Sequence, residues 1–225
     1  DLQAAVKKHK ADIGLAFDGD ADRCFLIDEK GAIVTPSTLT GLIAVRELKR
    51  KPGSSIIYNL ISSKAVPEVV NEHGGTAIRS RVGHSFIKAM MAETGAIFGG
   101  EHSGHFYFAD FWKADSGMLA ALFALAELSS SDKPLSELLA PYNRYVVSGE
   151  INTRVADTEK SLHIIRESFK QDYGIDELDG VTVTADEWWF NVRPSNTEPL
   201  LRLNVEADNK ATMEKVRDKV LDLIK

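Results

Sequence analysis

Three aspartates at alternate positions follow the first apolar segment of the chain. Asp18, Asp20 and Asp22 stand in the sequence DGDADR, directly after the apolar residues 13–17. Alternate residues of an extended turn can point to one side, where three like charges repel each other. A hard divalent cation that prefers oxygen ligands relieves this repulsion. The spacing therefore predicts a site for Mg²⁺ or Ca²⁺.

The same aspartates allow three other interpretations, of which the first conflicts with the neighbouring residues. An EF-hand loop would use them with Glu29 as its last ligand, but Arg23 occupies the position that requires glycine, and the flanking residues alternate like strands. Asp18 would be the nucleophile in a haloacid-dehalogenase-type phosphatase, whose strand also leads into a D-x-D sequence. The third interpretation is a solvated polar turn without a ligand.

A second polar segment, GGEHSGH over residues 99–105, lies between two short apolar segments. Its glycines let the backbone approach a ligand closely. Glu101 and Ser103 offer an acceptor and a hydroxyl group, which together suit a polyol. His102 and His105 are able to exchange protons or bind a metal ion. Taken alone, the segment also fits a simple turn.

A third segment, RPSNTEP over residues 193–199, combines an arginine with several small polar residues. Arg193 supplies a bidentate guanidinium group, and Ser195, Thr197 and the backbone amides of a tight loop supply further donors. Such a set suits a phosphate dianion. Proline, serine and asparagine also favour turns, so the segment is a turn in either interpretation.

The elements around these segments predict two types of domain. Residues 12–34 read as three short strands with too little core to fold alone. Helical and strand patterns alternate from about residue 35 to 142, which predicts a mostly parallel sheet covered by helices. Residues 118–128 are apolar nearly all round and predict a buried helix. The last 80 or so residues predict a small α+β domain. The fold class is therefore α/β, a mixed βαβ sandwich domain followed by a small α+β C-terminal domain.

The composition excludes several classes of partner. The formal net charge is -6 and no basic block occurs, which argues against a nucleic-acid-binding surface. A single cysteine, Cys24, excludes an internal disulfide and suits a reducing compartment. The sequence has no signal-peptide pattern and no apolar run of about 18 residues. We expect a cytoplasmic protein that binds neither nucleic acid nor membrane.

In this order, the segments DGDADR, GEHSGH and RPSNTEP resemble the motif set of the α-D-phosphohexomutase family, most of all the bacterial phosphomannomutase/phosphoglucomutase enzymes. The resemblance covers essentially the whole chain. Family members have four domains around one cleft, and a domain 1 serine, in a loop like TASHNP, carries the phosphoryl group. No such loop occurs in this sequence, so the resemblance implies an N-terminal half that is missing. The resemblance implies three segments. Residues 1–34 are the end of domain 2 with the metal loop, residues 35–142 are the sugar-binding domain 3, and residues 143–225 are the phosphate-binding domain 4.

The resemblance also implies roles for individual residues in three groups. The Mg²⁺ ligands would be Asp18, Asp20 and Asp22. The catalytic residues would be Arg23, Lys64, His84 and His105. The substrate-binding residues would be Glu101 and Ser103 for the sugar hydroxyl groups, and Arg193, Ser195, Asn196 and Thr197 for the non-reacting phosphate.

The implied activity interconverts hexose 6-phosphate and hexose 1-phosphate through an enzyme phosphoserine and a 1,6-bisphosphate intermediate. We expect mannose as the preferred sugar and glucose as a possible second one. Glucosamine-phosphate members usually have glycine where Asn196 stands, and GEHSGH also resembles the bacterial mannose/glucose mutases. Since the serine loop is absent, we expect the chain alone to be inactive. The alternatives are a non-catalytic fragment that binds sugar phosphate, or a phosphatase that uses Asp18.

Overall fold

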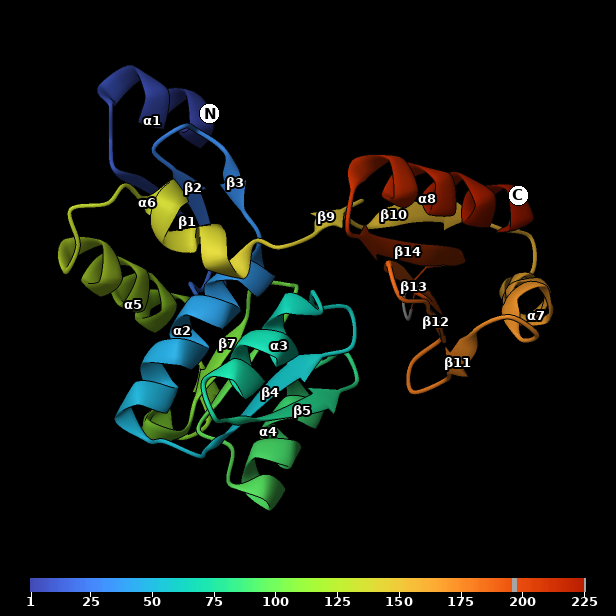
Figure 1. Ribbon diagram of the computed structural model, residues 1–225, viewed down its shortest axis with the longest axis horizontal. Helices are drawn as coiled ribbons and strands as arrows, with labels where there is room; N and C mark the ends of the chain where they lie inside the picture. Colours follow the sequence, from blue (N-terminus) through green and yellow to red (C-terminus); the bar gives the residue numbers. More distant parts are fainter. Residues whose placement is uncertain (196–197, 225) are drawn as a thin grey trace. The chain divides into compact units, whose positions relative to one another are not determined.

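The structure is a computed structural model that describes residues 1–195 and 198–224. The chain divides into two compact units, residues 1–144 and residues 145–225 (Figure 1). Within the described residues, no helix has both the length and the apolar character needed to cross a membrane. Each unit has its own hydrophobic core.

The first unit begins with a small antiparallel sheet in the order β1 (Ile13–Phe17), β2 (Cys24–Asp28) and β3 (Ile33–Val34). Helix α1 (Leu2–His9) packs on β1, and its residue Val6 is buried. Gly14 makes this close packing possible, because a Cβ atom there would lie 2.6 Å from Val6 Cγ2. The three strands predicted from the sequence are therefore present.

A five-stranded mixed sheet forms the centre of the first unit. Its order is β5 (Thr76–Ser80), β4 (Ser55–Asn59), β6 (Phe98–Gly100), β7 (Phe106–Phe108) and β8 (Ala114–Asp115). The pairs β4–β5 and β4–β6 are parallel, as predicted, whereas β6–β7 and β7–β8 are antiparallel. The expectation of a mostly parallel sheet was too simple, because the short connections before β7 and β8 cannot make a parallel crossover.

Helices cover this sheet and connect it to the smaller one. They are α2 (Pro36–Arg50), α3 (Ala65–Glu72), α4 (His84–Thr94), α5 (Gly117–Ser129) and α6 (Leu135–Leu139), with the short 3-10 helices η1 (Ala109–Phe111) and η2 (Ala140–Tyr142). The start of α2 has clear local causes: Pro36 occupies its first turn, and the Thr35 hydroxyl accepts a hydrogen bond from the Thr38 amide at 3.2 Å.

Helix α5 differs from the prediction. Its apolar sequence predicted a helix buried all round, but Met118 and Leu122 are 54% and 57% exposed. The buried positions are instead the small residues Ala120, Ala121 and Ala124. Small side chains let α5 approach α2 and the strands β1 and β2 closely on one side, which leaves the larger side chains on the other side.

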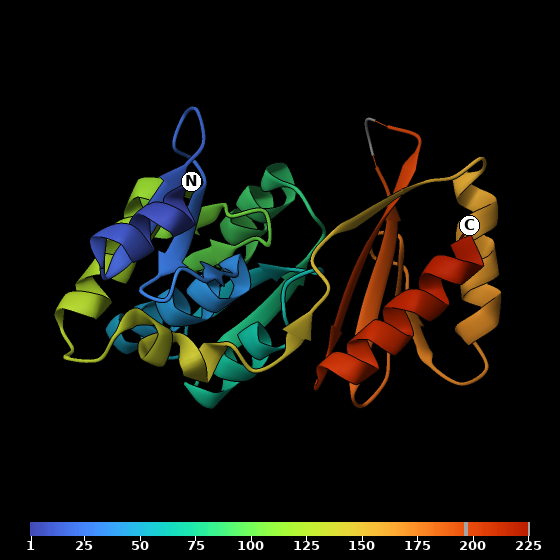
Figure 2. The ribbon, with the colours of Figure 1, turned by 90° about the horizontal axis from the view of Figure 1, so that it is seen from above.

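The second unit is an antiparallel sheet covered by two helices. The sheet has the order β10 (Ile151–Arg154), β14 (Leu200–Ala207), β13 (Trp188–Pro194), β12 (Val181–Thr184) and β11 (Gly174–Asp176), and β9 (Val146–Val147) also pairs with β14. Helices α7 (Thr158–Phe169) and α8 (Lys210–Ile224) lie on the same side of this sheet (Figure 2). Strands β9 and β10 are separated by a turn at Gly149, which adopts a left-handed conformation with φ +70°.

Candidate active site

The Asp18–Arg23 loop joins the antiparallel strands β1 and β2, whose last pair is Phe17 with Cys24. Ala21 holds the left-handed conformation in this loop, with φ +59°. Its carbonyl accepts a hydrogen bond of 3.1 Å from the amide of Gly117, the first residue of α5. A strained non-glycine residue that is fixed by a helix terminus is typical of functional loops.

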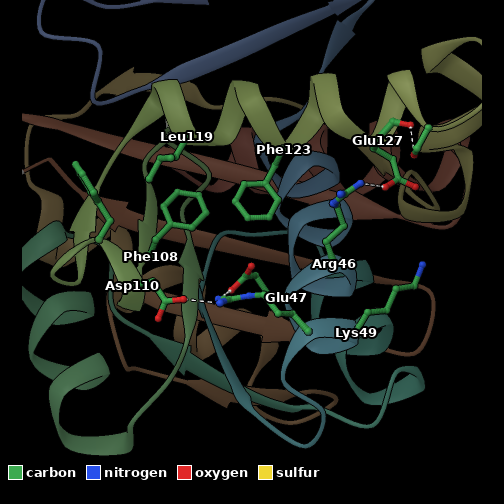
Figure 3. A pocket seen from close by; sticks show the side chains of 11 residues that line it. Arg46, Glu47, Lys49, Phe108, Asp110, Leu119, Phe123 and Glu127 are labelled. Atoms are coloured by element: carbon green, nitrogen blue, oxygen red, sulfur yellow. Dashed lines mark hydrogen bonds and ion pairs between the residues drawn. The ribbon is translucent and has the colours of Figure 1, made fainter.

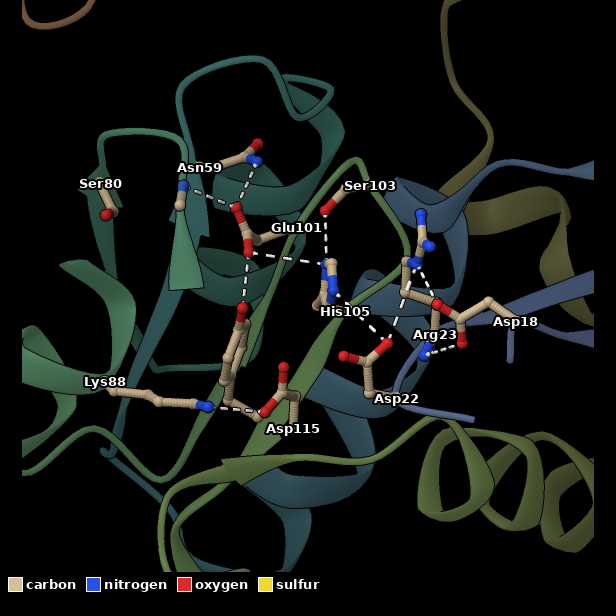
Figure 4. Close-up of polar contacts among 12 residues, drawn as sticks. Asp18, Asp22, Arg23, Asn59, Ser80, Lys88, Glu101, Ser103, His105 and Asp115 are labelled. Atoms are coloured by element: carbon tan, nitrogen blue, oxygen red, sulfur yellow. Dashed lines mark hydrogen bonds and ion pairs between the residues drawn. The ribbon is translucent and has the colours of Figure 1, made fainter. Parts of the chain in front are cut away.

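The three aspartates predicted as metal ligands lie together in this loop. Asp18, Asp20 and Asp22 each have a carboxylate oxygen within 4.8 Å of the others. Arg23 also contacts the group, because its Nε donates to Asp18 Oδ2 at 2.5 Å and lies 3.8 Å from Asp22 Oδ1 (Figure 4). The carboxylates are thus close enough to share one cation while Arg23 neutralises part of their charge.

The pKa values of Asp18 and Asp22 are shifted in opposite directions. Partial burial raises the pKa of Asp18, but hydrogen bonds from Arg23 outweigh this effect and hold the pKa below its ordinary value. Burial raises the pKa of Asp22 above its ordinary value, and the charges of Asp18 and Asp20 act in the same direction, although His105 opposes them. Asp22 Oδ1 is buried and accepts no hydrogen bond from the described residues. A bound divalent cation would satisfy this oxygen and relieve the repulsion, so the residues fit Mg²⁺.

The Glu101–His105 loop connects β6 to β7 as a tight turn. The Glu101 amide donates to the His105 carbonyl at 2.9 Å, and the Gly104 amide donates to the Glu101 carbonyl at 3.1 Å. Gly104 has φ +91°, and a Cβ atom there would lie 3.0 Å from the Phe25 ring. A glycine is therefore required at this position both by the backbone and by the neighbouring strand.

The two loops are joined to each other. Arg23 and His105 form an isolated antiparallel bridge, and the Cys24 amide donates to the Gly104 carbonyl at 3.1 Å. His105 Nε2 lies 3.6 Å from Asp22 Oδ1, while His105 Nδ1 and Ser103 Oγ are 2.8 Å apart. Asp18, Asp22, His105 and Ser103 therefore form one connected group of side chains (Figure 4).

The Glu101 side chain is buried, whereas its predicted contact with sugar hydroxyl groups suggested an accessible carboxylate. The residue is only 2% exposed, and its carboxylate accepts three hydrogen bonds from the protein. The donors are Tyr107 Oη at 2.6 Å, the Gly83 amide at 3.0 Å and Asn59 Nδ2 at 3.3 Å. Both carboxylate oxygens are thus engaged by protein groups, and the role of Glu101 in reading sugar hydroxyls stays a prediction.

Lys64 and His84 follow neighbouring strands of the central sheet. Lys64 precedes α3 after β4, and His84 begins α4 after β5. Since β4, β5 and β6 are parallel, their carboxyl ends lie at the same edge as the Glu101 loop. The Gly83 hydrogen bond brings the residue before His84 directly to Glu101.

The predicted phosphate-binding residues lie in the second unit. Arg193 on β13 is 6% exposed, and its Nη2 lies 3.2 Å from Glu150 Oε2. Arg202, directly opposite on β14, lies 3.5 Å from the other Glu150 oxygen and donates to Ser195 Oγ at 3.4 Å. The predicted residues Asn196 and Thr197 lie outside the described part of the chain.

Two guanidinium groups belong to paired residues of β13 and β14, where the Arg193 side chain is buried and the Arg202 side chain is partly exposed. Burial lowers the pKa of Arg193, and the neighbouring Arg202 acts in the same direction, although Glu150 partly compensates. The Nε atoms of Arg193 and Arg202 are buried and donate to no described residue. Such unsatisfied donors suit a phosphate group.

Sequence reasoning missed several of these residues. Arg202 and Glu150 were not selected, although a charged residue inside the apolar segment LLRLNV was a usable signal. Asn59 and Tyr107 were also missed. A further missed pair is Lys88 and Asp115, whose Nζ and Oδ1 are 2.7 Å apart. Asp115 shares with Asp22 and His105 a second group of mutually close ligand atoms.

A separate pocket of about 810 Å³ lies in the first unit between α2 and α5 and contains none of the predicted site residues (Figure 3). Its floor includes the stacked rings of Phe108 and Phe123. Several charged side chains around it are paired with each other, including Arg46 with Glu127 and Arg50 with Glu47. This pocket is therefore separate from the site residues that the sequence predicted.

Comparison with known proteins gives a consistent result. Three sequence profiles match in order: phosphoglucomutase/phosphomannomutase alpha/beta/alpha domain II over residues 1–31, alpha/beta/alpha domain III over residues 35–145 and the C-terminal domain over residues 150–223. The phosphomannomutase of Methanocaldococcus jannaschii is 46% identical over 100% of this chain and 50% of its own length. That of Escherichia coli K12 is 41% identical over 98% of this chain and 49% of its own length.

Solved structures agree with the sequence relatives. A phosphoglucomutase/phosphomannomutase family protein from Burkholderia thailandensis is 32% identical, with a TM-score of 0.87 over 99% of this chain and 48% of that protein. The chain thus spans about half the length of the curated relatives it matches. An α/β unit followed by an α+β unit is therefore an architecture that this chain shares with solved phosphohexomutase structures. The chain belongs to the phosphoglucomutase/phosphomannomutase family of α-D-phosphohexomutases.

Proposed function

We propose that this chain takes part in the interconversion of hexose 6-phosphate and hexose 1-phosphate, with mannose preferred and glucose as a second substrate. Residues 1–34 would provide the metal loop, residues 35–142 the sugar-binding domain and residues 143–225 the phosphate-binding domain. Curated relatives over the whole chain are phosphomannomutases, which supports the choice of sugar. The single cysteine supports a cytoplasmic location.

One observation carries the proposal. The acidic loop and the Glu101–His105 loop are hydrogen-bonded to each other through Arg23, Cys24, Gly104 and His105. In this arrangement three carboxylates, an imidazole and the Ser103 hydroxyl are near neighbours, which supports the proposal. A solvated polar turn would not need such a connection to a second loop.

The residues divide the proposed chemistry between them. Asp18, Asp20 and Asp22 would hold Mg²⁺, which when bound offsets the charge that develops on the transferring phosphoryl group. Arg23 adds a fixed positive charge beside the same oxygens. His105, between Ser103 Oγ and Asp22 Oδ1, is placed to move a proton to or from a sugar hydroxyl group.

The second unit would hold the phosphate that does not react. Arg193 and Arg202 supply paired guanidinium groups, and Ser195 lies next to them. Asn196 and Thr197 stay proposed members of this clamp. The sugar 1,6-bisphosphate must turn between two transfers, so a clamp built from charge and small donors suits either phosphate in turn.

The proposed phosphoryl carrier is a phosphoserine in a protein segment outside this chain. We therefore propose that the chain alone binds sugar phosphate but does not turn it over. A coupled mutase assay of the chain and of the full-length protein, beside calorimetric titration with mannose 6-phosphate, tests this. Binding without turnover by the chain supports the proposal. Turnover by the chain alone would contradict it and would favour chemistry at Asp18.

A further inference from the structure

We propose that Tyr107 and Asn59 are positioning residues, which hold the buried Glu101 carboxylate so that it fixes the loop before His84 against the loop that carries His105. The inference rests on the proposed function, because it explains how the two histidines of that site keep their places. It gives Glu101 a scaffold role in addition to the predicted contact with a sugar hydroxyl group.

Glu101 is buried, and among the described residues it forms no ion pair with a lysine or an arginine. A buried carboxylate is costly unless several donors satisfy it. Glu101 meets this condition with three donors from three segments, namely Tyr107, Asn59 and Gly83. His105 Nδ1 is further away, at 3.9 Å from Glu101 Oε1. The carboxylate is therefore oriented by neutral donors rather than by a cation.

Tyr107 provides the shortest of these hydrogen bonds. The residue is fully buried on β7, and Lys88 Nζ lies 5.7 Å from the centre of its ring. The His105 ring is stacked against it, with centroids 6.4 Å apart. Burial and the negative charge of Glu101 raise the pKa of the Tyr107 phenol, which stays a donor. One tyrosine thus contacts both Glu101 and His105.

Asn59 provides the second anchor at the end of β4. Its side chain is fully buried, and its Oδ1 accepts a hydrogen bond of 2.8 Å from Ser62 Oγ. This bond fixes the amide so that Nδ2 is the group that faces Glu101. The same Glu101 oxygen accepts the Gly83 amide, one residue before the start of α4. Glu101 thereby ties the loops after β4, β5 and β6 together (Figure 4).

Removal of the Tyr107 hydroxyl would leave Glu101 Oε1 with His105 as its nearest donor. The carboxylate would then rotate toward the imidazole, and Oε2 would move away from the Gly83 amide. Both histidines would lose their fixed positions, although the core around the Tyr107 ring would remain filled. The expected result is a loss of catalytic rate larger than the loss of substrate affinity.

Tyr107→Phe tests this in two ways. Hydrogen exchange of the Gly83 amide, measured by NMR in this chain, should become faster by about tenfold or more, while exchange in β4 is unchanged. In the full-length protein, kcat with mannose 6-phosphate should fall by about tenfold or more, with KM changed by less than about twofold. Tyr58→Phe is the matched control, because the Tyr58 hydroxyl makes no hydrogen bond within the described residues, and it should change neither quantity.

Asn59→Ser provides an independent variant and should give the same pattern. Unchanged Gly83 exchange in both variants would overturn the proposal, and so would faster exchange with an unchanged kcat. If the wild-type protein showed no mutase activity, the proposed function would fail and with it the catalytic part of this inference. The exchange measurement would still decide whether Tyr107 and Asn59 anchor the loop.

Discussion

Arg23 and His105 face each other in an isolated antiparallel bridge, so the acidic loop and the glycine-rich loop are held as one piece. The Cys24–Gly104 hydrogen bond continues this pairing. A change in the conformation of one loop must therefore move the other. This coupling explains why the aspartates and His105 are considered one site although they come from different sheets.

Gly117→Ala should destabilise the first unit and disturb the acidic loop. A Cβ atom on Gly117 would lie 2.4 Å from the Arg23 carbonyl oxygen, and this backbone atom cannot move without breaking the loop. We expect a loss of about 3 kcal/mol in the free energy of unfolding, measured by urea titration. Gly19→Ala is the control, since no atom lies within 4 Å of its Cβ position. Equal stabilities of the two variants would contradict this packing argument.

Asp20→Asn should weaken Mg²⁺ binding without a loss of stability. The substitution removes one of three mutually close carboxylates, and Asp20 is exposed to solvent. Calorimetric titration of the full-length protein with MgCl₂ should show at least about tenfold weaker binding. Asp12→Asn, at an exposed aspartate outside the loop, should bind as tightly as wild type. Equal affinities for all three proteins would exclude the metal site.

Arg193→Ala should depress kcat/KM by roughly 30- to 1000-fold, which corresponds to about 2–4 kcal/mol of transition-state binding. Arg193 is buried beside Arg202, so water would not replace the proposed contact of its guanidinium group with phosphate. Arg217→Ala is the control, because among the described residues the Arg217 guanidinium forms an ion pair only with the neighbouring Asp218 on α8. If both variants kept the wild-type value, the loop after β13 would be only a turn.

Cys24 should resist thiol reagents until the protein unfolds. Burial raises the pKa of its thiol to about 12, whereas an unfolded cysteine has a pKa of about 8.5. The folded state therefore keeps its proton longer than the unfolded state. The resulting contribution to stability is complete below the unfolded pKa and is lost as the pH rises toward about 12. Ellman's reagent at pH 8 should label urea-unfolded protein quickly and native protein slowly, and equal rates would contradict the burial of Cys24.

Local patterns in the sequence predicted much of the fold and site. The triple aspartate after an apolar strand and the glycine-rich loop before β7 are local features, so each was visible without knowledge of the other. Their hydrogen-bonded connection through Arg23 and His105 was not predictable from pattern alone, because it depends on which strand ends meet in space. Only the resemblance to a family connected the three segments, because their order along the chain matches the order of the family's motifs.

The unpredicted features share one cause, which is dependence on tertiary contacts. Tyr107 stands between two phenylalanines and resembles another core aromatic until the position of its hydroxyl group is known. Asn59 lies inside the apolar sequence IIYNLI, which does not show that β4 ends at this residue. The prediction that helix α5 is buried on all sides was wrong, because its apolar composition does not show which side of the helix lacks a packing partner.

Under the proposed function, the full-length protein moves a phosphoryl group between two positions of a hexose rather than to water. Phosphorus-31 NMR of the full-length protein with mannose 6-phosphate and Mg²⁺ tests this most directly. We predict that the 6-phosphate resonance declines while a hexose 1-phosphate resonance appears, until their ratio is constant. Release of inorganic phosphate alone, or no change with either mannose 6-phosphate or glucose 6-phosphate, would contradict the account.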